Sequence, residues 1–156
     1  MNHVERAGVL PIAFTLVHYV RGQDAHAIDL VDADRLLWDE HAPRFGHEGI
    51  IPSRGAPVAD AERVRIRDMD AWRAYQAAVF ARTEQALGQM TAERYDLPMF
   101  DGTRPASLAG GFLEAYVPEG PIRRTHAIEA WIYQHGCRHL GELEHARALV
   151  GLGGLD

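Results

Sequence analysis

Two histidines four residues apart, His135 and His139, have the spacing in this 156-residue chain that most directly suggests chemistry. Positions four apart on an α-helix lie on one face, so two such imidazoles can reach one metal ion. Nearby apolar residues have the spacing of a core-facing stripe, on which both histidines fall: Ile128, Trp131, Ile132, Leu143, Ala146 and Val150. A shared metal ion would explain two polar rings on such a face. The alternative is a pair of hydrogen-bonded or half-exposed histidines.

His18 is a third histidine in an apolar setting. It shares a helix face with Phe14, Ala25 and Ile28, although a solitary core histidine is usually just hydrogen-bonded. His26 lies well round the same helix and is expected to be exposed. His41 and His47 fall in a stretch that resembles a loop, and both are expected at the surface.

The elements that must position these histidines are helical. Apolar periodicity predicts helices over 10–37, over 68–90, where Asp68 or Asp70 can cap the first turn, and over 121–150. A short helix is predicted over 106–117. The segments 40–67 and 91–105 are rich in Gly and Pro and are expected to be loops, the first long enough to shape the mouth of a pocket. The sequence has no convincing strand, so the expected fold is an all-α helical bundle forming a single domain over 1–156.

Composition excludes several classes of protein. Apolar residues make up 47% of the chain and charged residues 24%, as in ordinary soluble domains, and the formal charge of −6 argues against nucleic-acid binding. No apolar run approaches a membrane span and no signal-like segment opens the chain, so a cytoplasmic protein without membrane partners is expected. The one cysteine, Cys137, excludes an internal disulfide and is expected to be a small buried group rather than a reactive thiol.

Several segments resemble, in their order and spacing, the DinB-like family of metal-binding helical bundles. Residues 14–24 are similar to the family's second helix, in which a histidine is followed by a short run ending in an acidic residue. The segment His-Gly-Cys-Arg-His-Leu-Gly-Glu at 135–142 is similar to the signature of the family's last helix. Further similarity lies in 37–46, 71–83 and 147–152, so the resemblance covers most of residues 9–152.

The resemblance implies an up-down-down-up four-helix bundle whose metal is held by three histidines, one from the second helix and two from the fourth. Carried over to this chain, the ligands are His18, His135 and His139. The family has a first helix before the histidine-bearing one, and here only residues 1–9 precede it. Either the start lies upstream of Met1 or another element fills the gap, so we expect a homodimer or docking of 106–117 into the vacancy.

Three imidazoles would leave coordination positions open, as in catalytic metal sites, and either zinc or nickel would suit them. Such a metal would remove the proton of a bound thiol. Relatives in the DinB-like family include mycothiol- and bacillithiol-dependent transferases and isomerases. The resemblance therefore implies a divalent-metal-dependent thiol S-transferase or isomerase acting on a small molecule, with a low-molecular-weight thiol as cofactor.

Other residues have weaker claims to the site. Asp24 and Glu142 could accept hydrogen bonds from the ligand histidines or from bound water, and Glu142 is favoured because it lies three residues after His139. Arg21 and Arg138 could meet a thiol cofactor or a carboxylate, or could simply be solvated. Two alternative functions stay open: a non-catalytic small-ligand or stress-response module with a structural or vacant metal site, and, less favoured, a metal-dependent hydrolase.

Overall fold

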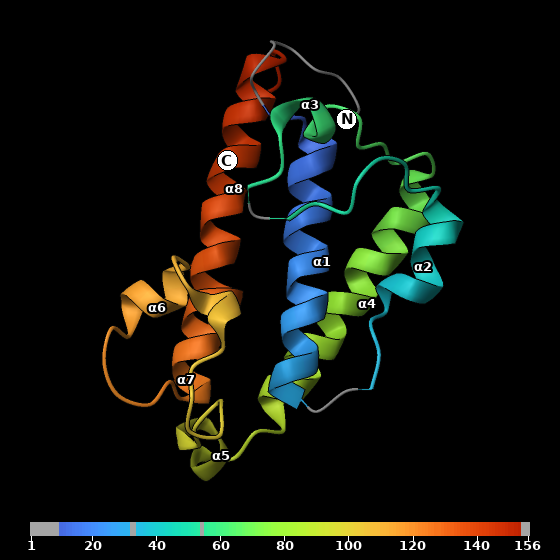
Figure 1. Ribbon diagram of the computed structural model, residues 1–156. Helices are drawn as coiled ribbons and strands as arrows, with labels where there is room; N and C mark the ends of the chain where they lie inside the picture. The colour runs from blue at the N-terminus through green and yellow to red at the C-terminus, as the bar shows by residue number, and fades with distance from the viewer. Residues whose placement is uncertain (1–9, 32–33, 54, 154–156) are drawn as a thin grey trace.

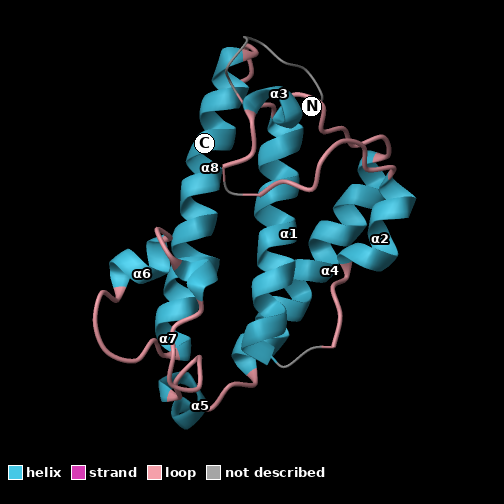
Figure 2. Ribbon diagram, in the orientation of Figure 1, coloured by secondary structure: helices cyan, strands magenta, loops and turns pink. Residues whose placement is uncertain are grey.

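Three long helical units side by side make up most of this protein. The computed structural model describes residues 10–31, 34–53 and 55–153, in which α1 (Ile12–Val31) lies between α4 (Met69–Gly88) and a long C-terminal helix (Figures 1 and 2). The described ranges contain no strand, only isolated antiparallel bridges at Glu48–Arg65 and Pro98–Arg123. The predicted all-α fold is confirmed. None of the helices in these ranges has an apolar stretch that could span a bilayer.

The C-terminal helix is continuous but not uniform. It runs through α7 (Arg124–Ala127), a π-helical segment (Ile128–Gln134) and α8 (His135–Leu149), in place of the single α-helix predicted over 121–150. Shorter elements connect the long helices: α2 (Trp38–Phe45), α3 (Val58–Ala61), α5 (Ala92–Asp96), a 3₁₀ turn (Ala106–Leu108) and α6 (Phe112–Tyr116). The prediction of loop throughout 40–67 was therefore wrong, since α2 and α3 fall in it.

The first predicted helix, 10–37, was too long. The observed α1 ends at Val31, residues 32–33 lie outside the described ranges, and bends at 34–37 lead into α2. The second prediction, 68–90, matches α4, whose first turn is capped by Asp68. Its carboxylate accepts hydrogen bonds from the amides of Asp70 and Ala71, at 2.9 and 3.0 Å.

Two apolar clusters hold these elements together. The larger joins α1, α2, α4 and the segment between α2 and α4, and its buried residues include Val17, Val20, Phe45, Val64, Trp72, Tyr75 and Val79. The smaller lies at the other end of α1, where Leu30 packs with Leu113 of α6 and with Ile122, Ala127 and Ala130. Part of the 106–117 segment thus packs on α1 and the C-terminal helix. The expected homodimer stays a prediction.

Asp24 joins α1 to both α2 and α4. The carboxylate is fully buried and accepts hydrogen bonds from the amides of Leu37 and Trp38, at 3.2 and 2.8 Å, and from the Tyr75 hydroxyl at 3.1 Å. It also forms an ion pair with Arg82. A carboxylate in this position satisfies free amides at the start of α2, which has no cap from its own chain segment. Asp24 is therefore a structural residue, and its expected place near the metal was wrong.

Replacing Asp24 should destabilise the fold without removing the histidine cluster. Asp24→Ala leaves Arg82 without its buried partner and two amides without an acceptor, so we expect a loss of about 3–5 kcal/mol of unfolding free energy. Tyr75→Phe removes one hydrogen bond and should cost only about 1 kcal/mol. Urea denaturation measures both, with Asp39→Ala, an exposed acid on α2, as the control. Equal stabilities for Asp24→Ala and Asp39→Ala would contradict this account.

Candidate metal centre

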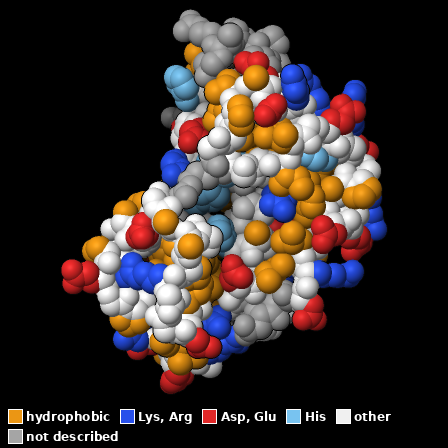
Figure 3. Space-filling model, in the orientation of Figure 1, with side chains coloured by type: hydrophobic (Ala, Val, Ile, Leu, Met, Phe, Trp, Pro, Cys, Tyr) orange, Lys and Arg blue, Asp and Glu red, His pale blue; other side chains and the backbone are white. Residues whose placement is uncertain are grey.

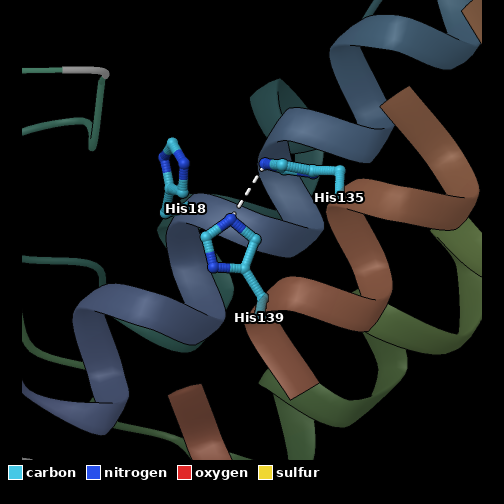
Figure 4. A group of neighbouring side chains, drawn as sticks. All are labelled: His18, His135 and His139. Carbon is cyan, nitrogen blue, oxygen red and sulfur yellow. Dashed lines mark hydrogen bonds between the residues drawn. The ribbon is translucent and has the colours of Figure 1, made fainter. Parts of the chain in front are cut away.

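Three histidine side chains converge between α1 and the C-terminal helix (Figure 4). One potential ligand nitrogen from each of His18, His135 and His139 lies within 4.8 Å of the other two. The ring centroids of His135 and His139 are 4.4 Å apart, and the His18 ring lies 5.5 and 4.9 Å from them. The residues that the sequence singled out, separated by more than a hundred positions, are therefore neighbours in space.

The pairing of the two helices explains this convergence. His18 meets His139, and His26, two turns further along α1, stacks on Trp131, two turns earlier on the C-terminal helix. The helices therefore run antiparallel. Between these contacts Gly22 faces His135, and a Cβ atom at position 22 would lie 3.2 Å from its Cε1 atom. The absence of a side chain at Gly22 thus makes room for the His135 ring.

The π-helical segment ends immediately before His135. The His135 amide donates to the carbonyl of Ala130, five residues earlier, in place of the usual four. A π-helical turn of this kind inserts one residue into an α-helix and rotates everything that follows. Such turns recur at functional sites, and this one sets the face on which His135 and His139 point toward α1.

Hydrogen bonds define the orientation of His139. Its Nδ1 atom lies 2.6 Å from a carboxylate oxygen of Glu142, and its Nε2 atom lies 2.9 Å from Nε2 of His135. The carboxylate favours a proton on Nδ1 of His139, which leaves the Nε2 lone pair directed toward the other rings. This carboxylate–histidine contact is the kind that orients metal-binding imidazoles. Glu142 accordingly occupies the position expected of it.

Burial keeps these rings neutral. Desolvation, followed by the nearby His139, lowers the pKa of His135 to about 3. Desolvation also lowers the pKa of His18 and of His139, partly opposed by a hydrogen bond with the Pro52 backbone for His18 and by Glu142 for His139. Metal ions bind the neutral form of imidazole, so the cluster is in the protonation state that a metal requires at neutral pH.

The donor set fits a divalent transition metal. Bonds of about 2.0–2.1 Å from a tetrahedral metal would place ligand nitrogens roughly 3.3 Å apart. The observed separation of 2.9 Å between the Nε2 atoms of His135 and His139 is close to this spacing. Nδ1 of His135 is buried and has no hydrogen-bond partner in the described part of the chain. An imidazole-only set suits zinc and nickel better than magnesium or calcium.

The cluster lies in the wall of an open cavity of about 870 Å³. Histidine side chains are visible in a hollow of the face drawn in Figure 3, with apolar side chains around it. Apolar lining residues come from several separate segments, and they include Phe14, Phe100, Leu108, Phe112, Leu113 and Trp131. A volume of this size is within the range of small-molecule sites, about 300–1,000 Å³.

The arginines, the cysteine and two further histidines that the sequence analysis discussed are placed as follows. The Arg21 guanidinium sits over the Trp38 ring at 5.6 Å, while Arg138 does line the cavity. Cys137 is exposed, not buried as expected. His41 and His47 are half-buried against aromatic rings of the main core, where surface positions were expected.

His26 is the residue of this site that sequence reasoning missed. It was expected to be exposed, but it is half-buried in the cavity wall, stacked on Trp131 with ring centroids 4.4 Å apart and planes at 15°. Its spacing from His18, two helical turns, was the available signal. Helical phase alone places residue 26 about 80° round from residue 18, which is still within reach of one broad groove.

Comparisons with known proteins support the helical fold but assign no family or function. No family model matches the sequence, and no curated protein matches it. The structure is similar to the crystal structure of a conserved protein from Enterococcus faecalis, with a TM-score of 0.71 and 18% sequence identity over 96% of this chain and 80% of that one. Likeness at this level of identity establishes a shared helical fold.

Filling the space at Gly22 should weaken metal binding. In Gly22→Ala the new Cβ atom meets the His135 ring, so the ring must move. We expect the affinity for zinc to fall by roughly tenfold, which is the size of effect seen when residues that support metal ligands are replaced. Gly141→Ala is the matched control, because a Cβ there meets nothing within 4 Å. Alanine stabilises a helix by up to about 1 kcal/mol at either position, so the metal-free variants should not unfold more easily. Competition with a zinc indicator measures the affinity, and equal values for both variants would contradict the role of Gly22.

Metal-free protein should lose stability between pH 7 and pH 5. Burial lowers the pKa of His26 to about 4 and that of His135 to about 3, whereas in the unfolded chain both are near 6.5. In this window the unfolded chain binds more protons than the folded chain. The free energy of unfolding therefore decreases as the pH is lowered from 7 to 5. Denaturation of chelator-treated protein at several pH values tests this, with His26→Phe expected to show a shallower slope. A stability independent of pH would contradict the burial of these neutral rings.

Proposed function

We propose that this protein is a divalent-metal-dependent enzyme of the DinB-like type, a thiol S-transferase or isomerase in which a metal held by His18, His135 and His139 activates a thiol. The observation that carries the proposal is the convergence of three neutral imidazoles at the wall of an open, largely apolar cavity. Zinc or nickel is the metal that this donor set favours.

The position of the cluster supports catalysis over a purely structural role. Structural zinc sites are closed by four protein ligands, whereas catalytic sites use three and leave a position for substrate or water. Here three histidines meet at the edge of the cavity, and the nearest carboxylate, Glu142, is engaged with Nδ1 of His139. A small ligand in the cavity therefore has access to the remaining coordination position.

The chemistry suited to this arrangement is nucleophilic attack by a thiolate. A bound divalent cation would lower the pKa of a coordinated thiol and hold it as the thiolate. The chain's own groups then have separate tasks. Glu142 holds the His139 ring in place, the positive charge of Arg138 near the cluster favours an anionic sulfur, and the apolar walls exclude water from the electrophile. In a transfer reaction the sulfur–carbon bond forms as the leaving group departs with the bonding electrons.

Metal content and thiol transfer should depend on the same residues. Purified protein without a histidine tag should contain close to one zinc or nickel ion per chain, and His139→Ala should lose both the ion and the conjugation of thiols to an electrophile such as 1-chloro-2,4-dinitrobenzene. His145→Ala, an exposed histidine near the end of α8, is the control and should retain both. Elemental analysis and absorbance assays measure the two properties.

Each alternative function has its own outcome in this experiment. Full metal content in His139→Ala would refute the ligand set. Stoichiometric metal with a large loss of thermal stability on chelation and no thiol turnover would favour the non-catalytic ligand-binding module. Turnover of ester or amide substrates without thiol would favour the hydrolase.

A further inference from the structure

A fourth histidine extends the site beyond the cluster. The His26 ring lies 6.3 Å from that of His135, and no nitrogen of His26 belongs to the group of ligand atoms within 4.8 Å of one another. Its stacking on Trp131 fixes the plane of the ring. His26 is therefore positioned to meet a ligand that extends away from the metal, and it lies outside the ligand set itself.

His26 has unused hydrogen-bonding capacity. Neither ring nitrogen is hydrogen-bonded to any residue in the described part of the chain, although the side chain is half-buried in the cavity wall. Burial lowers its pKa to about 4, so the ring is neutral at physiological pH and offers one donor and one acceptor. The ring nitrogens are not among the buried atoms that lack a partner, so a ligand in the cavity can reach them.

The charges around the cavity differ from one end to the other. Arg138 and Glu142 both line the end of the cavity at the cluster and shift the pKa of His18 and His139 in opposite directions, so that end carries one charge of each sign. Asp29 lies one turn after His26 on α1 and also lines the cavity. Asp29 is an exposed residue, although partial desolvation of its carboxyl group raises the pKa, and no salt bridge to that group is found among the described residues. A cationic group is thus favoured at the other end, beside His26 and Asp29.

Apolar side chains occupy the space between these ends. Phe100, Leu108 and Phe112 line one side of the cavity, and Trp131 forms the wall on which His26 stacks. A ligand that satisfies all three regions has a sulfur at the metal, an apolar body and a terminal group that donates hydrogen bonds.

We infer that His26 and Asp29 form a recognition subsite for the terminal amine of a thiol bound at the histidine cluster. The inference rests on the proposed function and adds the class of thiol that the site selects. His26 accepts a hydrogen bond from the amine through its unprotonated ring nitrogen, and Asp29 supplies the opposite charge. Neither residue takes part in bond formation, so both are positioning residues.

Cobalt-substituted protein allows a direct test, because a thiolate bound to Co(II) gives a charge-transfer absorption band. The probes are cysteamine and its longer homologues, each compared with the alkanethiol of equal chain length. We expect the best aminothiol to bind roughly tenfold more tightly than its alkanethiol, the effect of one hydrogen bond to a charged group. The advantage should disappear in His26→Phe, which keeps an aromatic ring on Trp131, and in Asp29→Asn, but persist in part in His26→Gln. The control is Asp39→Asn, an exposed acid outside the cavity.

The possible results separate this inference from the function on which it rests. Loss of the amine advantage in both variants, with cobalt content and alkanethiol affinity unchanged, supports the subsite. Retention of the advantage in His26→Phe, or equal binding of both thiol classes by the wild type, overturns the subsite and leaves the proposed function standing. Loss of cobalt in His26→Phe would make His26 a metal ligand and also overturn it. Wild-type protein that binds cobalt but no thiol overturns both.

Discussion

The close approach of α1 to the C-terminal helix is the constraint on which the candidate site depends. Imidazoles from two helices can share one ion only if the backbones are near enough for short side chains to meet. Gly22 faces the His135 ring from one helix, and Gly136 faces the Tyr19 hydroxyl from the other, where a Cβ would lie 3.1 Å from that oxygen. Small residues on both sides of the contact allow the two helices to pack this closely.

The two sides of α1 have different tasks. His18, Gly22 and His26 succeed one another along the side that meets the C-terminal helix, whereas Asp24 points into the contact with α2 and α4. The Asp24 carboxylate fixes α1 through hydrogen bonds that an exposed residue could not maintain against water. The histidines therefore project from a helix whose position is already determined. Such support is what keeps a metal-binding constellation close to its working geometry.

Much of this arrangement could be predicted from the sequence, because it depends on periodicity. Helical spacing predicted α1, α4 and the C-terminal helix, and it placed His135 and His139 on one face. Spacing within one helix does not show which helix lies opposite, so it could not pair His18 with His139. That pairing came from the family resemblance, and the comparisons with known proteins leave the membership itself a prediction.

The errors have a common physical origin in tertiary contacts. Asp24 was expected as a possible site-lining acid, and it ends the run after His18 in the family resemblance. Its partners, the amides of Leu37 and Trp38 and the side chains of Tyr75 and Arg82, become neighbours only after folding. His26 was missed for the same reason, since its stacking partner Trp131 lies more than a hundred residues away. The π-helical turn before His135 has no distinct residue pattern that marks it in advance.

The role of Glu142 bears on whether the cluster is structural or catalytic. A carboxylate three residues after His139 could in principle become a fourth ligand and close the coordination sphere. Instead its oxygen lies 2.6 Å from Nδ1 of His139, on the side of the ring opposite to the nitrogen that faces His135. A carboxylate held in this way makes the imidazole a better donor without occupying a coordination position. Because the cluster also borders the cavity, a coordination position left open on a bound metal would be accessible to a ligand from that cavity.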